Sequence, residues 1–259
     1  MREVNAILTI AYRDLLKLLR DRLRLASTLI FPLIFIAVLG GSLQANLGQS
    51  VGYNFLTFTF TGVLAQTLFM SATQGIISLM DDRENDFSQE MFVSPISRYA
   101  IIFGKVLGET LVALTQGVGI VIFGLIIGIP ISLLQLIGLL PTTLVVCLFG
   151  GAFGVVILSL VSSRRAAEQI FPFILLPQFF LAGVFSPIKV LPWYLDLLSK
   201  ISPMRYAVDL TRAVFYLGQP DYAQTVLQGP PFNLTVIAAL FAVFLFGGTT
   251  LFVRRERNR

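Results

Sequence analysis

The sequence predicts an all-α membrane protein, in which an N-terminal amphipathic helix precedes six transmembrane helices. Hydrophobic residues make up 56% of the 259 residues and charged residues only 13%, about half the charged share of an ordinary soluble domain. The mean hydropathy is +0.83, so folding in water would leave more apolar surface than one core of this size could bury. Six apolar segments also approach the roughly 20 residues that cross a hydrocarbon core.

The first 24 residues predict a basic helix that lies on the membrane surface. Its apolar and basic residues both recur at three- and four-residue steps, on different faces. The apolar positions are Val4, Ile7, Leu8, Ala11, Leu15, Leu18 and Leu19, and the basic positions are Arg13, Lys17, Arg20 and Arg24. Such a helix binds at the headgroup boundary, where anionic lipid attracts its cations. Alternatively, this segment only sets orientation, and Asp14 and Asp21 form surface pairs with neighbouring arginines that contribute little.

We expect three parts along the chain. They are a cytoplasmic interfacial helix at 1–24, a six-span domain at 25–253 and a cytoplasmic basic tail at 254–259. The predicted spans are 25–45, 55–80, 101–128, 133–161, 168–186 and 232–253. Pro172 and Pro177 interrupt the short fifth span and predict a kink there.

Charge in the connecting segments predicts the orientation. Lys and Arg are absent from 46–54 and 129–132, whereas 1–24 contains six of them and 254–259 contains four. Because cytoplasmic loops carry the excess of basic residues, both termini are expected in the cytoplasm of a multi-pass protein of the inner cell membrane. The net charge of +5 is therefore expected to reflect topology and anionic lipid, and no nucleic acid partner is expected.

The loop after the second predicted span indicates a short helix parallel to the membrane. It begins with acidic residues, which favour a helix N-terminus, and Phe87 and Met91 share one face. Ser94 can cap the next helix and Pro95 suits its first turn. The apolar surface formed by Phe87 and Met91 either binds in a groove on another protein or inserts into the lipid interface.

Charged and amide side chains inside the spans are the candidate functional residues. Lys105 and Glu109 can pair at i,i+4 while the lysine reaches toward the cytoplasm. Glu109 either joins adjacent helices or takes part in cargo passage or energy transmission, since intramembrane carboxylates are costly. Five neutral residues either line a path or bond helices together, namely Gln66, Thr67, Ser71, Gln74 and Gln116. Small-xxx-small contact faces are expected at Gly104/Gly108, Gly124/Gly128 and Gly150/Gly154.

The segment 187–231, between the last two spans, is too long for a tight turn. Its prolines, from Pro187 onward, and an aromatic pair that includes Trp193 indicate short half-inserted helices at the outer surface. The charged residues expected near the headgroups there are Lys200, Arg205, Asp209 and Arg212. An ordinary outer loop anchored by Trp193 is the alternative.

Several chemistries are excluded by composition. The chain contains no histidine and one cysteine, Cys147, so His-based catalysis, His or thiolate metal sites and an internal disulfide are not expected. Gly104-Lys105-Val106 lacks the upstream glycine and the following Ser/Thr of a phosphate-binding loop. We therefore expect a non-enzymatic subunit that binds no metal or cofactor itself.

Four ordered blocks carry a resemblance that covers nearly the whole chain. They run from Tyr12-Arg13-Asp14 to Arg22, from Arg83-Glu84-Asn85 to Arg98, over Gly104-Lys105-Val106-Leu107-Gly108-Glu109, and from Gly183-Val184-Phe185-Ser186-Pro187 through Leu191-Pro192-Trp193-Tyr194 to Arg212. In this order they resemble the permease subunits of type-2 ABC transporters, which include drug and polysaccharide exporters. Arg22, where the family favours proline, and Asp86-Phe87, where it often has Gly-Thr, depart from the pattern.

The resemblance implies a specific assembly. Two six-span permeases, identical or paralogous, would dock on two ATPase subunits that supply ATP and Mg²⁺ chemistry. The loop after the second span would be the coupling helix that contacts the ATPase. Carried over to this chain, its residues are Glu84, Asn85, Asp86, Phe87, Ser88, Gln89, Glu90 and Met91. Short re-entrant helices after Pro187, including Trp193, Arg205, Asp209 and Arg212, would cover the outer end of the path.

The expected function is therefore ATP-driven export of an amphiphilic drug-like or lipid-like molecule. A polysaccharide or lipid-linked glycan is the alternative cargo. A second alternative is an ion-coupled carrier or channel, which would need several intramembrane acids or a selectivity ring. Among the charged residues, only Glu109 and Lys105 lie inside a predicted span away from its ends.

Overall fold

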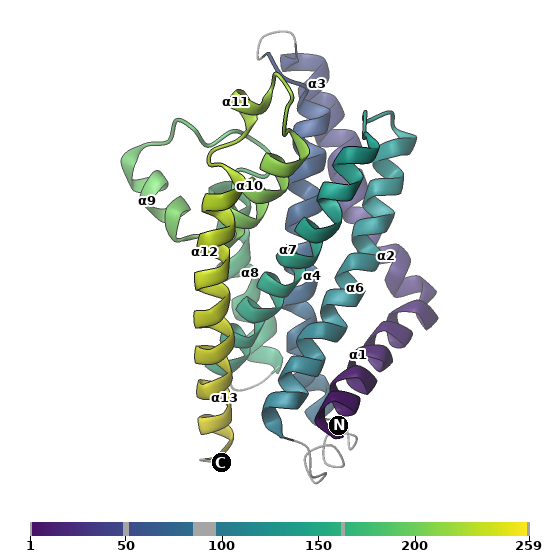
Figure 1. Cartoon of the computed structure of the whole chain (residues 1–259), viewed down its shortest axis with the longest axis vertical. Coiled ribbons are helices and arrows are strands. Elements are labelled where there is room, and N and C mark those ends of the chain that lie inside the picture. Colours follow the sequence, from purple (N-terminus) through teal and green to yellow (C-terminus); the bar gives the residue numbers. More distant parts are fainter. Residues whose placement is uncertain (1, 49–51, 85–96, 162–163, 258–259) are drawn as a thin grey trace.

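A computed structural model describes residues 2–48, 52–84, 97–161 and 164–257, and all regular structure in these ranges is helical. The long helices lie side by side along the longest axis of the molecule (Figure 1). Both termini lie at the end where α4 (Phe55–Glu84) ends and α6 (Arg98–Ile126) begins, whereas α3 (Gly41–Leu47) and α11 (Tyr222–Thr225) lie at the opposite end (Figure 1). The predicted coupling residues Asn85 to Met91 lie outside the described ranges, and Glu84 is the last residue of α4.

Five helical segments are long and apolar enough to cross a membrane. They are Leu25–Leu47, Phe55–Leu79, Tyr99–Ile126, Leu133–Leu160 and Tyr222–Arg255. Each coincides with one of the predicted spans, although the last begins ten residues earlier than predicted. Five of the six predicted spans therefore coincide with helices of the described chain that are long and apolar enough to cross a membrane.

The remaining predicted span corresponds to α8, Arg164–Leu181, which stays helical across Pro172 and Pro177. Its first turns contain Arg164, Arg165 and Glu168. Because of these three charged residues, the helix as a whole is less apolar than the five segments above. The helix also ends earlier than predicted, because the chain turns at Gly183, whose φ of +70° suits glycine.

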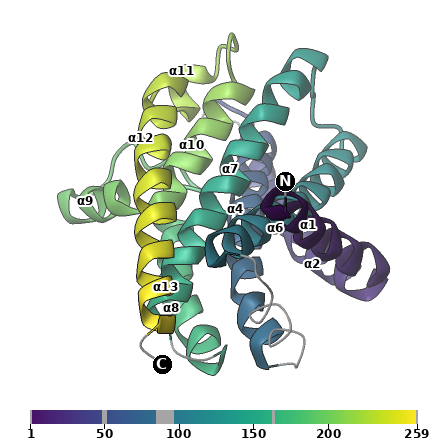
Figure 2. The same ribbon diagram turned by 60° about the horizontal axis from the view of Figure 1, so that its bottom comes forward.

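The N-terminal segment is divided into several helices. α1 spans Arg2–Arg20, and α2 follows at Arg22–Ile34, so the predicted helix over 3–24 is interrupted at Asp21. The π-helix η1, Phe35–Gly40, and α3, Gly41–Leu47, continue the same run. α1 packs along α6, Arg98–Ile126, at the end that Figure 2 brings forward.

Two glycines of α6 allow this close packing. A Cβ atom at Gly104 would lie 3.1 Å from Ile10 Cβ, and one at Gly108 would lie 3.0 Å from the Cα atom of Ala11. The predicted Gly104/Gly108 contact face is thus confirmed, with α1 as its partner. α1 consequently buries one apolar face against protein and leaves Val4, among other apolar residues, exposed.

The centre of the molecule is α4, Phe55–Glu84, which packs mainly against α6 and α7, Leu133–Leu160. Gly150 and Gly154 of α7 lie against the α4 backbone, as predicted, and Thr73 Oγ1 donates a hydrogen bond to the Gly150 carbonyl oxygen at 2.8 Å. The predicted contact face at Gly124/Gly128 is confirmed only for Gly124, which lies against Phe60 of α4. Gly128 has φ of +85° and no neighbour that would meet a Cβ atom, so it belongs to the α6–α7 turn.

Helix α6 begins after Ser97, whose side chain accepts a hydrogen bond from the backbone N–H of Ala100. The cap of this helix is therefore Ser97 and not Ser94, which lies outside the described residues. Glu3 of α1 accepts hydrogen bonds from the backbone N–H and hydroxyl of Ser97. This contact joins the start of α1 to the start of α6.

The segment 187–231 contains short helices, as predicted, and their half-inserted position in the membrane stays a prediction. They are α9, Trp193–Ile201, α10, Pro203–Phe215, and α11, Tyr222–Thr225. α9 stands away from the bundle in both views (Figures 1 and 2), whereas α10 packs against α4, α7 and α12. The C-terminal segment consists of α12, Pro230–Ala242, η2, Val243–Gly247, and α13, Gly248–Arg257.

Candidate functional site

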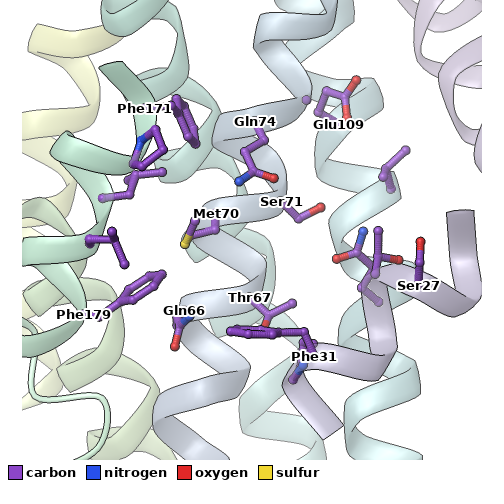
Figure 3. Close-up of a pocket in the computed structure, with 18 residues that line it drawn as sticks. Ser27, Phe31, Gln66, Thr67, Met70, Ser71, Gln74, Glu109, Phe171 and Phe179 are labelled. Atoms are coloured by element: carbon purple, nitrogen blue, oxygen red, sulfur yellow. The ribbon is translucent and has the colours of Figure 1, made fainter. Parts of the chain in front are cut away.

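A cavity of about 500 Å³ lies between α2, α4, α6 and α8. Figure 3 shows its lining side chains. The five neutral polar residues for which the sequence left two interpretations all lie on its wall: Gln66, Thr67, Ser71, Gln74 and Gln116. Four of them follow one another along α4, so this side of the cavity is rich in amide and hydroxyl groups.

The opposite side of the cavity is largely apolar. Phe171 and Phe179 of α8 lie across from α4, and Phe31 approaches from α2 (Figure 3). Met70 adds an apolar side chain from α4 itself. The cavity therefore combines aromatic contact area with neutral hydrogen-bonding groups, which is typical of sites for small amphiphilic ligands.

Glu109 is the single ionisable side chain among the described residues that line the cavity. Its Oε1 lies 2.9 Å from Lys105 Nζ, so the predicted i,i+4 ion pair is confirmed. The Ser78 hydroxyl donates a longer hydrogen bond of 3.5 Å to the same oxygen. A Cβ atom at Gly75 would overlap Glu109 Oε2, so the glycine on α4 is what allows the carboxylate to lie against this helix.

Lys105 has a second carboxylate partner that sequence reasoning missed. Its Nζ lies 2.8 Å from Asp14 Oδ2 on α1, and both side chains are almost completely buried. The prediction that Lys105 reaches toward water is therefore wrong, because α1 supplies a counter-ion inside the protein. Arg13 Nη2 lies 3.0 Å from the other Asp14 oxygen at the edge of this cluster.

The periodicity of α1 already contains the signal for Asp14. Ala11 and Leu18, three residues before and four residues after it, are both buried against the protein. A carboxylate on that apolar face has to be paired when the face packs. The interpretation of Asp14 as one of several surface charges overlooked this position.

At the other end of the molecule, Asp209 attaches the loop before α12 to α10. Its carboxylate accepts hydrogen bonds from the backbone N–H groups of Leu227 and Gln228, at 2.7 and 2.8 Å, and from Asn233 Nδ2 at 2.8 Å. Asp209 is buried, so its carboxylate is enclosed by protein groups, and its position near the headgroups stays a prediction. The free backbone donors of a tight loop explain why a carboxylate is retained inside.

Arg212 is also buried inside the protein. Its Nη2 donates to the carbonyl oxygen of Val184 at 3.0 Å, and its guanidinium lies 3.6 Å from the centroid of the Phe58 ring. Cation–π and carbonyl contacts of this kind partly compensate for the loss of water. Arg212 thus holds α10, α4 and the turn after α8 together.

The other predicted residues of this outer segment lie nearer the surface. Arg205 donates to Ser199 Oγ at 2.8 Å, and Pro187 is exposed. Trp193 is 79% exposed on α9, which is compatible with an aromatic anchor. Lys200 donates a hydrogen bond to Asp196 on the same helix, and this bond lowers the pKa of the Asp196 carboxyl.

Asp209→Asn is expected to reduce stability by about 2 kcal/mol, because hydrogen bonds to a charged acceptor are each worth about 1.5–3 kcal/mol and an amide nitrogen would face backbone donors. SDS-titrated unfolding in mixed micelles measures the change. Asp196→Asn, at an exposed ion pair, is the control and should change little. Wild-type unfolding of the Asp209 variant would contradict this assignment.

Comparison with known proteins gives one family match over most of the chain. The family model described as ABC-2 type transporter matches residues 5–216. A protein named as a transport permease, ycf38 of Porphyra purpurea, is 27% identical over 87% of this chain and 79% of its own length. A protein named as a multidrug ABC transporter permease, YbhR of Escherichia coli K12, is 28% identical over 59% and 43%, and nodulation protein J of Rhizobium meliloti is 25% identical over 73% and 72%.

Proposed function

This chain belongs to the ABC-2 type transporter family, and from this premise we propose that it is the permease subunit of an ATP-driven exporter for amphiphilic drug-like or lipid-like molecules. The observation that carries the proposal is the cavity between α2, α4, α6 and α8, with its aromatic and neutral polar walls. Such walls suit a molecule with a large apolar body and a few polar groups.

Energy would come from a separate subunit. We propose two ATPase subunits, which bind ATP and Mg²⁺, beneath two permeases that are identical or paralogous. Among the described residues, no three His, Cys, Asp or Glu side chains gather as metal ligands would. In this proposal the permease itself forms the path and performs no catalysis.

The orientation follows from the same assembly. The ATPase subunits would dock at the end of the molecule that contains both termini, α1 and the two helix ends that flank residues 85–96 (Figure 1). This end would face the cytoplasm at the inner membrane. The short helices α9 and α10 would lie at the outer side as re-entrant elements, and α8 would be the fifth of six spans.

The helices give this assembly a route for transmitting movement. α4 forms the polar wall of the cavity and continues to Glu84, where the proposed coupling helix, residues 84–91, begins. When ATP closes the two ATPase subunits, movement of this loop would displace the end of α4. The cavity wall would move with it because α4 is one continuous helix of 30 residues.

Purification of the tagged chain in mild detergent tests the assembly. We expect a P-loop ATPase to co-purify in a two-to-two ratio and to be lost in the Phe87→Asp/Met91→Asp variant, because two charges would disrupt an apolar knob in a groove. Leu217→Asp, at an exposed apolar residue of the opposite end, is the control and should retain the ATPase.

Transport in vesicles then separates the two mechanisms. Export should stop when ATP is depleted and persist when the ion gradient is collapsed. A chain that purifies without an ATPase from its native membrane, and whose transport follows the ion gradient, would instead be an ion-coupled carrier.

A further inference from the structure

We propose that the cavity binds a lipophilic organic cation, and that the positive charge of this ligand replaces Lys105 as the counter-ion of Glu109. The inference rests on the proposed function, since it specifies the cargo class of the same cavity. It follows from the charges of the wall, from the two partners of Lys105 and from the position of the Glu109 carboxylate.

The charges of the cavity wall are complementary to a cationic ligand group and not to an anionic one. Its described residues include one carboxylate and neither lysine nor arginine, so an anionic group would find no counter-ion there. The rings of Phe31, Phe171 and Phe179 offer negative π faces, which attract organic cations. Gln66 is buried, and its Oε1 has no hydrogen-bond partner among the described residues, which adds an acceptor to the same wall.

The ion pairs make an exchange of counter-ions feasible. Lys105 Nζ lies 2.9 Å from Glu109 and 2.8 Å from Asp14. If a ligand cation forms an ion pair with Glu109, Lys105 still forms its ion pair with Asp14. No charge is then buried without a partner. This matters because an uncompensated buried charge is far more costly than an exchanged one.

The position of Glu109 determines the orientation of the bound ligand in the cavity. The carboxylate lies against Gly75 of α4, where any side chain would overlap it. Phe171 and Phe179 lie across the cavity on α8 (Figure 3). A cationic group would therefore lie near α4 and α6, with the apolar body of the ligand against α8.

Equilibrium binding of tetraphenylphosphonium tests the inference, with tetraphenylborate as its near-isosteric anion. The full-length chain, together with any ATPase subunit it retains, is placed in lipid nanodiscs, and binding to empty nanodiscs is subtracted. Each ion is measured separately and without nucleotide. The wild-type protein should bind the phosphonium, and its affinity for the borate should be at least about tenfold lower, which corresponds to about 1.4 kcal/mol.

Variants of opposite expected effect make the test specific. Glu109→Gln should weaken phosphonium binding about tenfold or more. Asp14→Asn/Lys105→Met removes one carboxylate and the competing ammonium together, and should strengthen binding several-fold. Asp196→Asn, which removes a carboxylate on α9 outside the cavity, should remain within about twofold of wild type.

Wild-type affinity in Glu109→Gln, equal binding of both ions or weaker binding in the double variant would overturn the inference. ATP-dependent export of another cargo, without phosphonium binding, would overturn it and leave the proposed function intact. Phosphonium binding that depends on Glu109, in a chain that recruits no ATPase, would support the recognition and refute the exporter.

Discussion

Lys105→Met is expected to destabilise the protein by about 3–5 kcal/mol, the cost of breaking a buried ion pair by removing one partner. The lysine side chain is 3% exposed and lies between the carboxylates of Asp14 and Glu109. Without its ammonium, two negative charges would face each other across a buried space. Removing the lysine should also loosen α1 from α6, because the Asp14–Lys105 pair joins these helices.

The double variant Asp14→Asn/Lys105→Met separates charge from packing. It keeps the methylene volume of the lysine and removes one carboxylate together with the ammonium, so the repulsion between the two carboxylates is relieved and only part of the lost stability should return, because Glu109 still lacks its counter-ion. SDS-titrated unfolding in mixed micelles measures both variants and the two single changes. If the effects of Asp14→Asn and Lys105→Met simply add, the residues do not act as a pair and the assignment fails.

The sequence predicts the long helices well because each is determined by its own composition. Among the described residues, helices long and apolar enough to cross a membrane coincide with five of the six apolar runs that were marked as spans. The pair of Lys105 and Glu109 was equally local, since residues four apart meet on any helix. Such features need no knowledge of how the helices are arranged.

The candidate site could be predicted only in part because its residues come from four helices. Gln66, Ser71 and Gln116 were candidates either for a path or for helix packing, and the sequence could not distinguish these roles. Their common cavity depends on how α2 and α8 lie beside α4, which long-range packing determines. Asp14 was missed for the same reason, since its partner Lys105 is 91 positions away in the chain.

In the segment 187–231, a different factor limits what the sequence predicts. Its short helices and its exposed Trp193 agree with a sequence-based reading of prolines and aromatic residues. Asp209 and Arg212 were expected near the headgroups because they belong to the segment between the last two predicted spans. Each is buried where backbone groups require a partner, and local sequence does not show which loop will supply those groups.

Gly150→Ala is expected to destabilise the contact between α4 and α7 by about 3 kcal/mol, at the upper end of ordinary overpacking. A Cβ atom there would overlap the Phe69 carbonyl oxygen and lie 2.9 Å from its Cα atom. These are backbone atoms of the central helix, so no flexible side chain can move aside. Separating the helices would also break the hydrogen bond from Thr73 Oγ1 to the Gly150 carbonyl oxygen.

Gly247→Ala provides the matched control, because nothing lies within 4 Å of the Cβ atom that it adds. This change should stabilise the C-terminal segment by roughly 0.5–1 kcal/mol, the usual gain of alanine over glycine inside a helix. Unfolding in SDS gives both values, and gel filtration in detergent reports whether Gly150→Ala still folds. Equal effects of the two substitutions would mean that α4 and α7 are not in backbone contact at Gly150, and the arrangement of the cavity wall on α4 would then have to be revised.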